Sequence, residues 1–440
     1  MSEAPRLERR IGLVGSTLLS FNGVLGGAIF ALPAVLAADF GAFSPWLFPL
    51  VALASLLIVV PFALSAAAFP QSGGPAAYGA VFGRFAGFEL GWVYYVARSA
   101  AFAANANVLA AYCARWWPGA DQGMARAVII VAVTAALAAA NIAGVKRALR
   151  LLGGLTLLKA VPLLIAAITA LLLTFPPPAP GPLPEFGAFE TGALLVFYAF
   201  VGFENAVVPA GETRDSKRVL PRAILTTIGV TTLLYFLVQM AFVSALPGGG
   251  SDDKAPLIDL GAWLAGPTGA MILTLAAIAS LGGNLHGILA STSRVTSALA
   301  ERGDLPRWFA AVSPRFVTPA NSIAFLALLS AALALIGSYV WLAVISTLAR
   351  LIVYAVTIAA LPRAPGRPAR IPPWLTATGA AGIALCIWGA FQATAQAWLT
   401  LGGLALAGAL LYAVARRATA GSAAASVSAI HPPPSNRDPS

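Results

Sequence analysis

The chain has 440 residues, of which 59% are hydrophobic and only 10% are charged, and its mean hydropathy is +0.84. A water-soluble domain carries about one quarter charged residues, so this composition excludes an ordinary soluble protein and indicates a membrane protein. The net charge of +11 does not indicate a nucleic-acid-binding protein, because the basic residues lie in short segments between long apolar runs.

The apolar runs are long enough to cross a bilayer, which takes about 20 residues per helix. We therefore predict an all-α polytopic membrane protein whose membrane domain covers 11–415. Residues 1–10 would form a cytoplasmic N-terminal segment, and 416–440, rich in Ala, Ser and Pro, would be a disordered cytoplasmic tail. The twelve predicted transmembrane helices cover 11–37, 43–68, 83–114, 124–144, 150–174, 192–210, 219–246, 266–300, 319–337, 339–361, 374–394 and 398–415.

Two of these segments are interrupted. The first contains Phe21-Asn-Gly-Val-Leu-Gly-Gly-Ala-Ile-Phe-Ala-Leu-Pro33, with three glycines and a closing proline. The sixth contains Phe197-Tyr-Ala-Phe-Val-Gly-Phe-Glu204, with a glycine and then an acid. An acid at this depth is costly enough to indicate a functional site, and a pair of interrupted helices in corresponding halves is typical of a transporter binding site.

An interrupted helix exposes backbone amides, which bind anions, and backbone carbonyls, which bind cations. An amino acid carries one group of each sign. The first break is predicted to contain Val24 to Ala28, where Gly26 and Gly27 let a carboxylate approach the backbone. The sixth segment would offer carbonyls to an ammonium group from Phe200, Val201 and Gly202. The alternative is that these glycines only allow helices to pack closely.

Basic residues concentrate on one side of the predicted membrane domain. The opposite side would hold only Arg115, Arg126 and Lys254. This bias predicts a multi-pass protein of the cell (cytoplasmic) membrane with both termini in the cytoplasm. Cys113 and Cys386 offer no disulfide or metal framework, so we expect neither a metal site nor a cofactor.

These residues resemble the permeases of the amino acid/polyamine/organocation (APC) superfamily. Gly26-Gly-Ala-Ile-Phe-Ala-Leu-Pro33 is similar to the first-helix signature, although the last glycine of the usual small-residue triplet is Ala28 here, which leaves slightly less space for a substrate carboxylate. Further similar segments follow in the family's order: Pro70-Gln-Ser-Gly-Gly-Pro-Ala-Ala-Tyr78, Gly87-Phe-Glu-Leu-Gly-Trp92, Gly211-Glu-Thr-Arg-Asp-Ser-Lys-Arg-Val-Leu-Pro-Arg-Ala-Ile224, Ser293-Arg-Val-Thr-Ser-Ala-Leu-Ala-Glu-Arg-Gly-Asp-Leu-Pro306 and Thr318-Pro319.

The resemblance implies a 5+5 inverted repeat, about 11–174 and 192–361, with helices 1 and 6 unwound at mid-membrane and two peripheral helices at about 374–415. It implies alternating-access transport of an amino acid or a related amine. It also implies a carboxylate site at Leu25, Gly26, Gly27 and Ala28 and an amine site at Phe200, Val201 and Gly202. By the same resemblance Tyr198 would gate the site, and Glu204 matches an acid thought to sense protons in some members.

Lys159 lies nine residues beyond Arg150, on the order of 14 Å deep in a regular helix, which is too deep for a lysine to snorkel fully. Sodium-coupled relatives of this fold hold an ion between helices 1 and 8, whereas some sodium-independent members place a fifth-helix lysine there. Thr156-Leu-Leu-Lys-Ala-Val-Pro162 resembles the second case. The lysine would repel sodium and could gain and lose a proton, or it could stay charged and tether helix 1.

Other polar residues are predicted at mid-membrane depth. Glu204 could be a protonated acid bonded to a neighbouring helix, or it could pair with Arg98, since buried charges usually pair. Arg98 could instead face the cavity and bind a second carboxylate, which would make the substrate acidic. Asn284 and His286 could shape selectivity, although a lone helical histidine is more often a packed hydrogen-bonding residue. Arg350 also lies at mid-membrane depth.

The sequence therefore predicts a secondary active transporter of an amino acid, proton-coupled and sodium-independent, whose partners are the substrate, protons and the lipid bilayer. The alternative is an exchanger, because the region from Tyr198 to Glu204 also resembles antiporters that swap an amino acid for its decarboxylated amine. An enzyme is disfavoured, because the chain has two histidines, and one of them, His431, lies in the tail.

Overall fold

The computed structural model describes residues 11–69, 74–144, 148–207, 210, 213–250 and 254–430. Within these ranges the regular structure is helical, apart from an isolated β-bridge between Ile11 and Thr213. The expected N-terminal segment 1–10, residues 70–73 and 211–212 of two family-like motifs, and 431–440 of the tail lie outside the described part of the chain.

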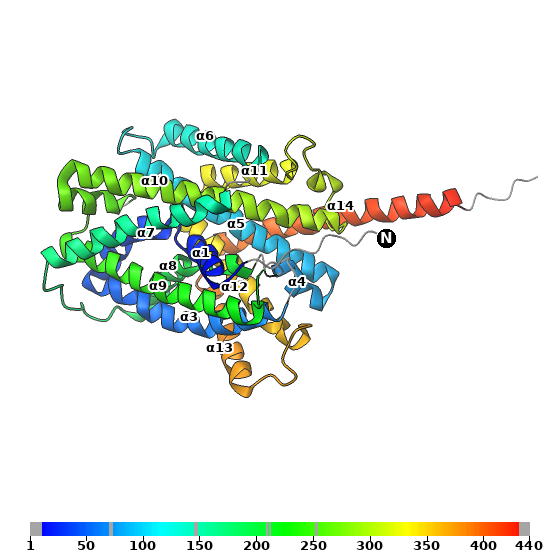
Figure 1. Ribbon diagram of the computed structural model, residues 1–440, viewed down its shortest axis with the longest axis horizontal. Coiled ribbons are helices and arrows are strands. Elements are labelled where there is room, and N and C mark those ends of the chain that lie inside the picture. Colours follow the sequence, from blue (N-terminus) through cyan, green and yellow to red (C-terminus); the bar gives the residue numbers. More distant parts are fainter. Residues whose placement is uncertain are drawn as a thin grey trace, which may run out of the picture.

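The helices follow one another with short connections (Figure 1). Those before residue 180 are α1 (Leu13–Val24), α2 (Ala28–Phe40), η1 (Gly41–Phe43), α3 (Ser44–Ala67), α4 (Pro75–Gly79), η2 (Ala80–Phe82), α5 (Arg84–Cys113), α6 (Gly123–Ile142) and α7 (Ala148–Leu173). Those after it are α8 (Phe186–Phe200), η3 (Phe203–Val207), α9 (Ser216–Ala245), α10 (Pro256–Glu301), η5 (Arg307–Ala310), α11 (Ala320–Ile336), α12 (Tyr339–Ala360), η6 (Leu361–Arg363), α13 (Pro373–Phe391) and α14 (Ala395–Ile430).

Every predicted transmembrane segment coincides with helix, and most ends agree within a few residues. Eight helical stretches of the described chain have the length and hydropathy of a membrane span. The largest difference at a start is in α10, which begins at Pro256 rather than at 266. Its backbone turns at Ala265 and Gly266, so the predicted start marks the kink rather than the first helical residue.

Both predicted interruptions are present. α1 ends at Val24 and α2 begins at Ala28, while α8 ends at Phe200 and the 3-10 helix η3 begins at Phe203. Between the last two, Gly202 has a φ of 116°, a conformation that residues with a Cβ rarely adopt. A Cβ on Gly202 would lie 2.8 Å from the backbone nitrogen of Val24, so the two breaks touch and only glycine fits at this point.

The helices differ in how deeply they are buried. In Figure 1, α1, α8, α5 and α12 lie near the middle of the bundle, and α6, α13 and α14 lie at its edges. In an 18-residue apolar window of the span 186–207, which contains the broken end of α8, 71% of residues are buried, and the value is 72% in a window of the span 339–363 around α12. The value is only 17% in the corresponding windows of α6 and of the span 395–418 in α14. The broken helices are therefore enclosed by protein, as bare backbone at membrane depth requires.

The end of α14 differs from the sequence prediction. A disordered tail was expected from 416, but α14 remains helical to Ile430 and projects beyond the bundle (Figure 1). The residues 416–430 are rich in alanine, the best helix former, so they continue the helix even though they have little apolar surface to pack.

Candidate functional site: a cavity at two helix breaks

A narrow cavity of about 20 Å³ lies where the two breaks meet; in this conformation it has room for about one water molecule and is far smaller than a ligand pocket. Six helical elements supply its wall, from the α1–α2 break to α12. The lining residues are Gly23, Val24, Gly26, Gly27, Ala28, Arg98, Ala101, Asn105, Tyr198, Val201, Asn284, Ile288 and Arg350.

The amide side of the cavity is the start of α2. The Gly27 amide donates to Asn105 Oδ1 at 3.0 Å, and the Gly26 amide donates to the Val24 carbonyl at 2.7 Å. Both amides predicted for a carboxylate thus have protein partners in this conformation. The Ala28 amide has no acceptor among the described residues, and as the first residue of α2 it is at the end of the helix where anions are stabilised.

A chain of amide side chains holds this break in place. Asn105 of α5 donates through Nδ2 to Asn284 Oδ1 of α10 at 2.8 Å. Asn284 in turn donates through Nδ2 to the main-chain carbonyl of Asn22 at 3.1 Å. A Cβ on Gly27 would collide with Asn105 Oδ1, so glycine is required for this contact. The break is therefore bonded to both α5 and α10.

The carbonyl side is the end of α8. Its last carbonyls lack intrahelical partners because the helix stops at Phe200. Val201 lines the cavity, and its amide donates to the Tyr198 carbonyl at 3.2 Å. Phe200 and Gly202 are not among the lining residues; the Phe200 ring packs edge-on against Phe48, with centroids 6.4 Å apart. The cavity thus borders both the N-terminal end of α2 and the C-terminal end of α8.

A family model for amino acid permeases matches residues 11–415 of the chain. The chain belongs to the amino acid permease family. An uncharacterized transporter of Mycobacterium tuberculosis is 31% identical to it over 401 residues, which cover 87% of each chain. The branched-chain amino acid permease of Bacillus subtilis is 27% identical over 362 residues, 76% of this chain and 75% of that one.

The D-serine/D-alanine/glycine transporter of Escherichia coli is 25% identical over 259 residues, which cover 55% of this chain and 54% of its own length. The family and these relatives are transporters rather than enzymes. With its apolar helical stretches, the chain is therefore a multi-pass membrane permease, and the expectation of an APC-type permease is confirmed.

Lys159 of the permease lies on α7, fully buried and behind the cavity wall. Its Nζ is 2.5 Å from Asn22 Oδ1, in the last turn of α1 before the break. The main-chain carbonyl of the same asparagine accepts from Asn284 of α10. Lys159 thus lies where α1, α7 and α10 meet, which is compatible with both alternatives drawn from the sequence, a proton-coupling group and a tether.

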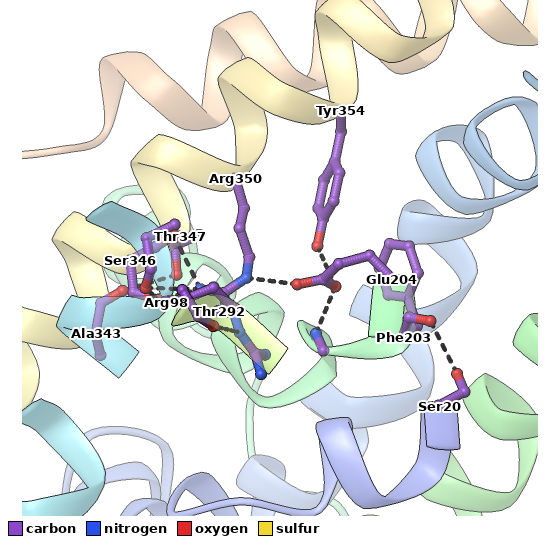
Figure 2. Close-up of polar contacts among 12 residues, drawn as sticks. Ser20, Arg98, Phe203, Glu204, Thr292, Ala343, Ser346, Thr347, Arg350 and Tyr354 are labelled. Atoms are coloured by element: carbon purple, nitrogen blue, oxygen red, sulfur yellow. Dashed lines mark hydrogen bonds and ion pairs between the residues drawn. The ribbon is translucent and has the colours of Figure 1, made fainter. Parts of the chain in front are cut away.

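Glu204 forms a buried network with α12 (Figure 2). Its Oε1 is 2.8 Å from Arg350 Nε, and its Oε2 accepts from Tyr354 Oη at 2.8 Å and from the Gly202 amide at 2.8 Å. The Arg350 Nη1 also donates to Ser346 Oγ and, at 3.3 Å, to its carbonyl. The alternative in which Glu204 pairs with Arg98 is wrong in this structure: Arg350 of α12 pairs with the carboxylate, and Arg98 is bonded to Thr292.

Arg98 of α5 is 3% exposed and lines the cavity, as one of the sequence alternatives proposed. Its Nε is 3.4 Å from Thr292 Oγ1 of α10, and Figure 2 shows the two side chains together beside Arg350. Tyr198 also lines the cavity, and its ring packs edge-on against Tyr339 with centroids 6.1 Å apart. An aromatic pair thus borders the cavity near the end of α8.

Some predicted residues lie outside the lining. Leu25 is fully buried in the break without facing the cavity, and His286 is half-buried on another face of α10. The His286 Nδ1 is 3.0 Å from Asn141 Nδ2 of α6. This position matches the alternative of a packed, hydrogen-bonded histidine better than a role in selectivity.

Asn22, Gly23 and Asn105 were not among the residues predicted for the site. Gly23 lines the cavity, and the two asparagines bond to Lys159 and to the Gly27 amide. The available signal was their residue type: a lone asparagine within an apolar helix needs a partner, because an unsatisfied amide in the membrane is costly.

Proposed function

We propose that this permease is a secondary active transporter that moves an amino acid across the cytoplasmic membrane, driven by protons and independent of sodium. The observation that carries the proposal is the contact of Lys159 Nζ with Asn22 Oδ1, one turn from the break that borders the cavity. A cation of the protein at this junction of α1, α7 and α10 leaves sodium without a favourable place there.

The substrate would bind between the two walls of the cavity. Its carboxylate would approach the amides of Gly26, Gly27 and Ala28, with the free Ala28 amide as the first contact, and Val24 and Leu25 would shape the break around it. Its ammonium would approach the carbonyls of Phe200 and Val201, where the turn at Gly202 directs the chain away from the helix axis. Tyr198 would close over the bound substrate, because its ring already borders the cavity.

Lys159 would couple proton movement to the position of α1. The charged ammonium holds Asn22, and loss of its proton removes one of the charge-assisted contacts that fix α1 against α7. Because Asn22 also accepts from Asn284, the change would reach the Gly27 amide through Asn284 and Asn105. Glu204 could take part only if its contacts change during the cycle, since Arg350 and Tyr354 occupy both of its carboxylate oxygens.

The architecture proposed for this cycle has twelve membrane spans. The repeats at about 11–174 and 192–361 would each begin with a broken helix, and the helices at 374–415 would be peripheral. The supporting observations are the two breaks at the starts of the two repeats and the low burial of α14. The basic residues of the loops support cytoplasmic termini.

The test is uptake of radiolabelled amino acids into proteoliposomes with an inward proton gradient, an inward sodium gradient or neither. The proposal requires uptake that follows the proton gradient, ignores sodium and is lost in Lys159→Ala. Lys217→Ala, which changes an exposed lysine at the start of α9, is the matched control and should behave like the wild type. Uptake that follows only sodium would contradict the proposal.

An exchanger is the second candidate, on the resemblance of the segment from Tyr198 to Glu204 to antiporters. Counterflow separates the two functions. An exchanger would take up labelled substrate only when the vesicles contain unlabelled substrate or the corresponding amine, whatever the proton gradient. A symporter would fill empty vesicles.

A further inference from the structure

Arg98 is placed to meet a substrate rather than a protein partner. It shares one face of α5 with Ala101 and Asn105, and all three line the cavity. Asn105 is bonded at the start of α2, where a substrate carboxylate is expected. Arg98 precedes Asn105 by seven positions in the helix, a rise of about 10 Å, so the arginine borders the part of the cavity nearer the N-terminus of α5.

Most N–H donors of the Arg98 guanidinium have no protein acceptor among the described residues. An arginine has five N–H donors. Within the described residues, Arg98 makes a single hydrogen bond, from Nε to Thr292 Oγ1 at 3.4 Å. Both of its Nη groups, buried with the rest of the 3% exposed residue, are left for a ligand in the cavity.

The charges around the cavity do not balance. Arg98 and Arg350 line it, and no acidic residue is among the lining residues of the described chain. Glu204 lies behind Arg350 and is bonded to its Nε. Arg350 thus has a carboxylate as its counter-ion, whereas Arg98 has none among the described residues, and a buried charge without a partner is costly in the membrane. A neutral zwitterion would bring no net charge to offset this excess.

We propose that the substrate is an acidic amino acid, whose side-chain carboxylate is bound by the Nη groups of Arg98. This inference rests on the transport function proposed above and names its substrate class. The α-carboxylate at the start of α2 and the side-chain carboxylate at Arg98 would then lie at two ends of one cavity. The planar fork of a guanidinium suits a carboxylate, which accepts two parallel hydrogen bonds from it.

The test compares isosteric pairs in proteoliposomes of the full-length permease: L-glutamate with L-glutamine, and L-aspartate with L-asparagine, with L-leucine as a bulky neutral substrate. We expect kcat/KM for the acid to exceed that for its amide by about tenfold to a hundredfold, the range for charged hydrogen bonds. Arg98→Gln should remove this preference, and Arg98→Lys should keep part of it, because lysine retains the charge but not the fork.

Arg294→Gln is the matched control. Arg294 lies on α10, is exposed, and donates to the Ala290 carbonyl outside the cavity, so its loss should leave the preference unchanged. Thermal stabilisation of the wild-type permease by glutamate and by glutamine provides a second measurement that does not depend on folding of the Arg98 variants. Greater stabilisation by glutamate is expected.

Two results would overturn the inference and leave the transport function standing. One is transport of glutamine, asparagine or leucine as fast as the acids, unchanged in Arg98→Gln. The other is uptake of neutral amino acids that requires chloride, which would make an inorganic anion the partner of Arg98. Failure of every amino acid to be bound or transported would instead refute the proposed function itself.

Discussion

Glu204 and Arg350, 146 residues apart in the chain, form an ion pair of 2.8 Å at the wall of the cavity, which Arg350 lines. Their side chains are 2% and 1% exposed, so the pair is buried in the protein. It joins the interrupted end of α8 to α12, and Tyr354 of α12 bonds to the same carboxylate. The pair therefore fixes the second break against a continuous helix.

Removal of one partner of this pair should be strongly destabilising. Arg350→Met leaves a buried carboxylate without its counter-ion, and such changes cost about 3–5 kcal/mol. We expect a marked fall in the melting temperature of the detergent-solubilised permease. A double change, Glu204→Gln with Arg350→Met, should lose less than the sum of the two single changes, whereas additive losses would contradict a direct pair.

The same cycle distinguishes Arg350 from Arg98 as the partner of Glu204. Arg98 makes no hydrogen bond to Glu204 among the described contacts, so its coupling to that residue should be smaller than that of Arg350. A larger coupling between Arg98 and Glu204, measured by melting temperature in the same detergent, would mean that the sequence-based pairing was right.

Gly27 should tolerate no side chain. A Cβ there collides with Asn105 Oδ1 and approaches Leu281 Cδ2 to 3.3 Å, so Gly27→Ala would push Asn105 away from the break. We expect uptake to fall by more than about tenfold, because the pocket loses both space and a hydrogen bond. Gly282→Ala is the control: it lies on α10, where a Cβ meets no atom within 4 Å, and it should transport normally.

His286 should contribute nothing to substrate choice. Its ring is bonded to Asn141 of α6 and is absent from the cavity lining. We predict that His286→Gln changes the free energy of unfolding, followed by thermal melting, by no more than about 1 kcal/mol. It should also leave the ratio of KM values for two substrates unchanged. A changed KM ratio, measured by competition uptake, would show instead that His286 contributes to substrate selectivity.

The sequence was sufficient to predict the helices and both breaks, for a local reason. Glycine weakens a helix wherever it lies, so the glycines from Gly23 to Gly27 and at Gly202 indicated the interruptions without any knowledge of the fold. The depth of Lys159 in the membrane was predicted by counting residues along one helix, and the structure shows that its side chain is buried. The helical extension to Ile430 was missed because composition was judged by packing rather than by the helix propensity of alanine.

The partners of buried side chains could not be predicted in the same way. Whether Glu204 meets Arg98 or Arg350 depends on the rotation of α5 and α12 about their axes, which long-range packing decides. Asn22 and Asn105 were missed because each belongs to a chain of contacts across three helices. The apolar pattern of these helices is too uniform to show which face turns toward the cavity.

The most direct test of proton coupling is the internal pH of sodium-free proteoliposomes when substrate is added outside, without an imposed gradient. Proton coupling through Lys159 predicts that the lumen acidifies as substrate enters, and that Lys159→Ala abolishes this acidification while Lys217→Ala preserves it. Uptake by the wild-type permease with no change in internal pH would contradict it, because the contact between Lys159 and Asn22 would then serve only to hold α1 in place.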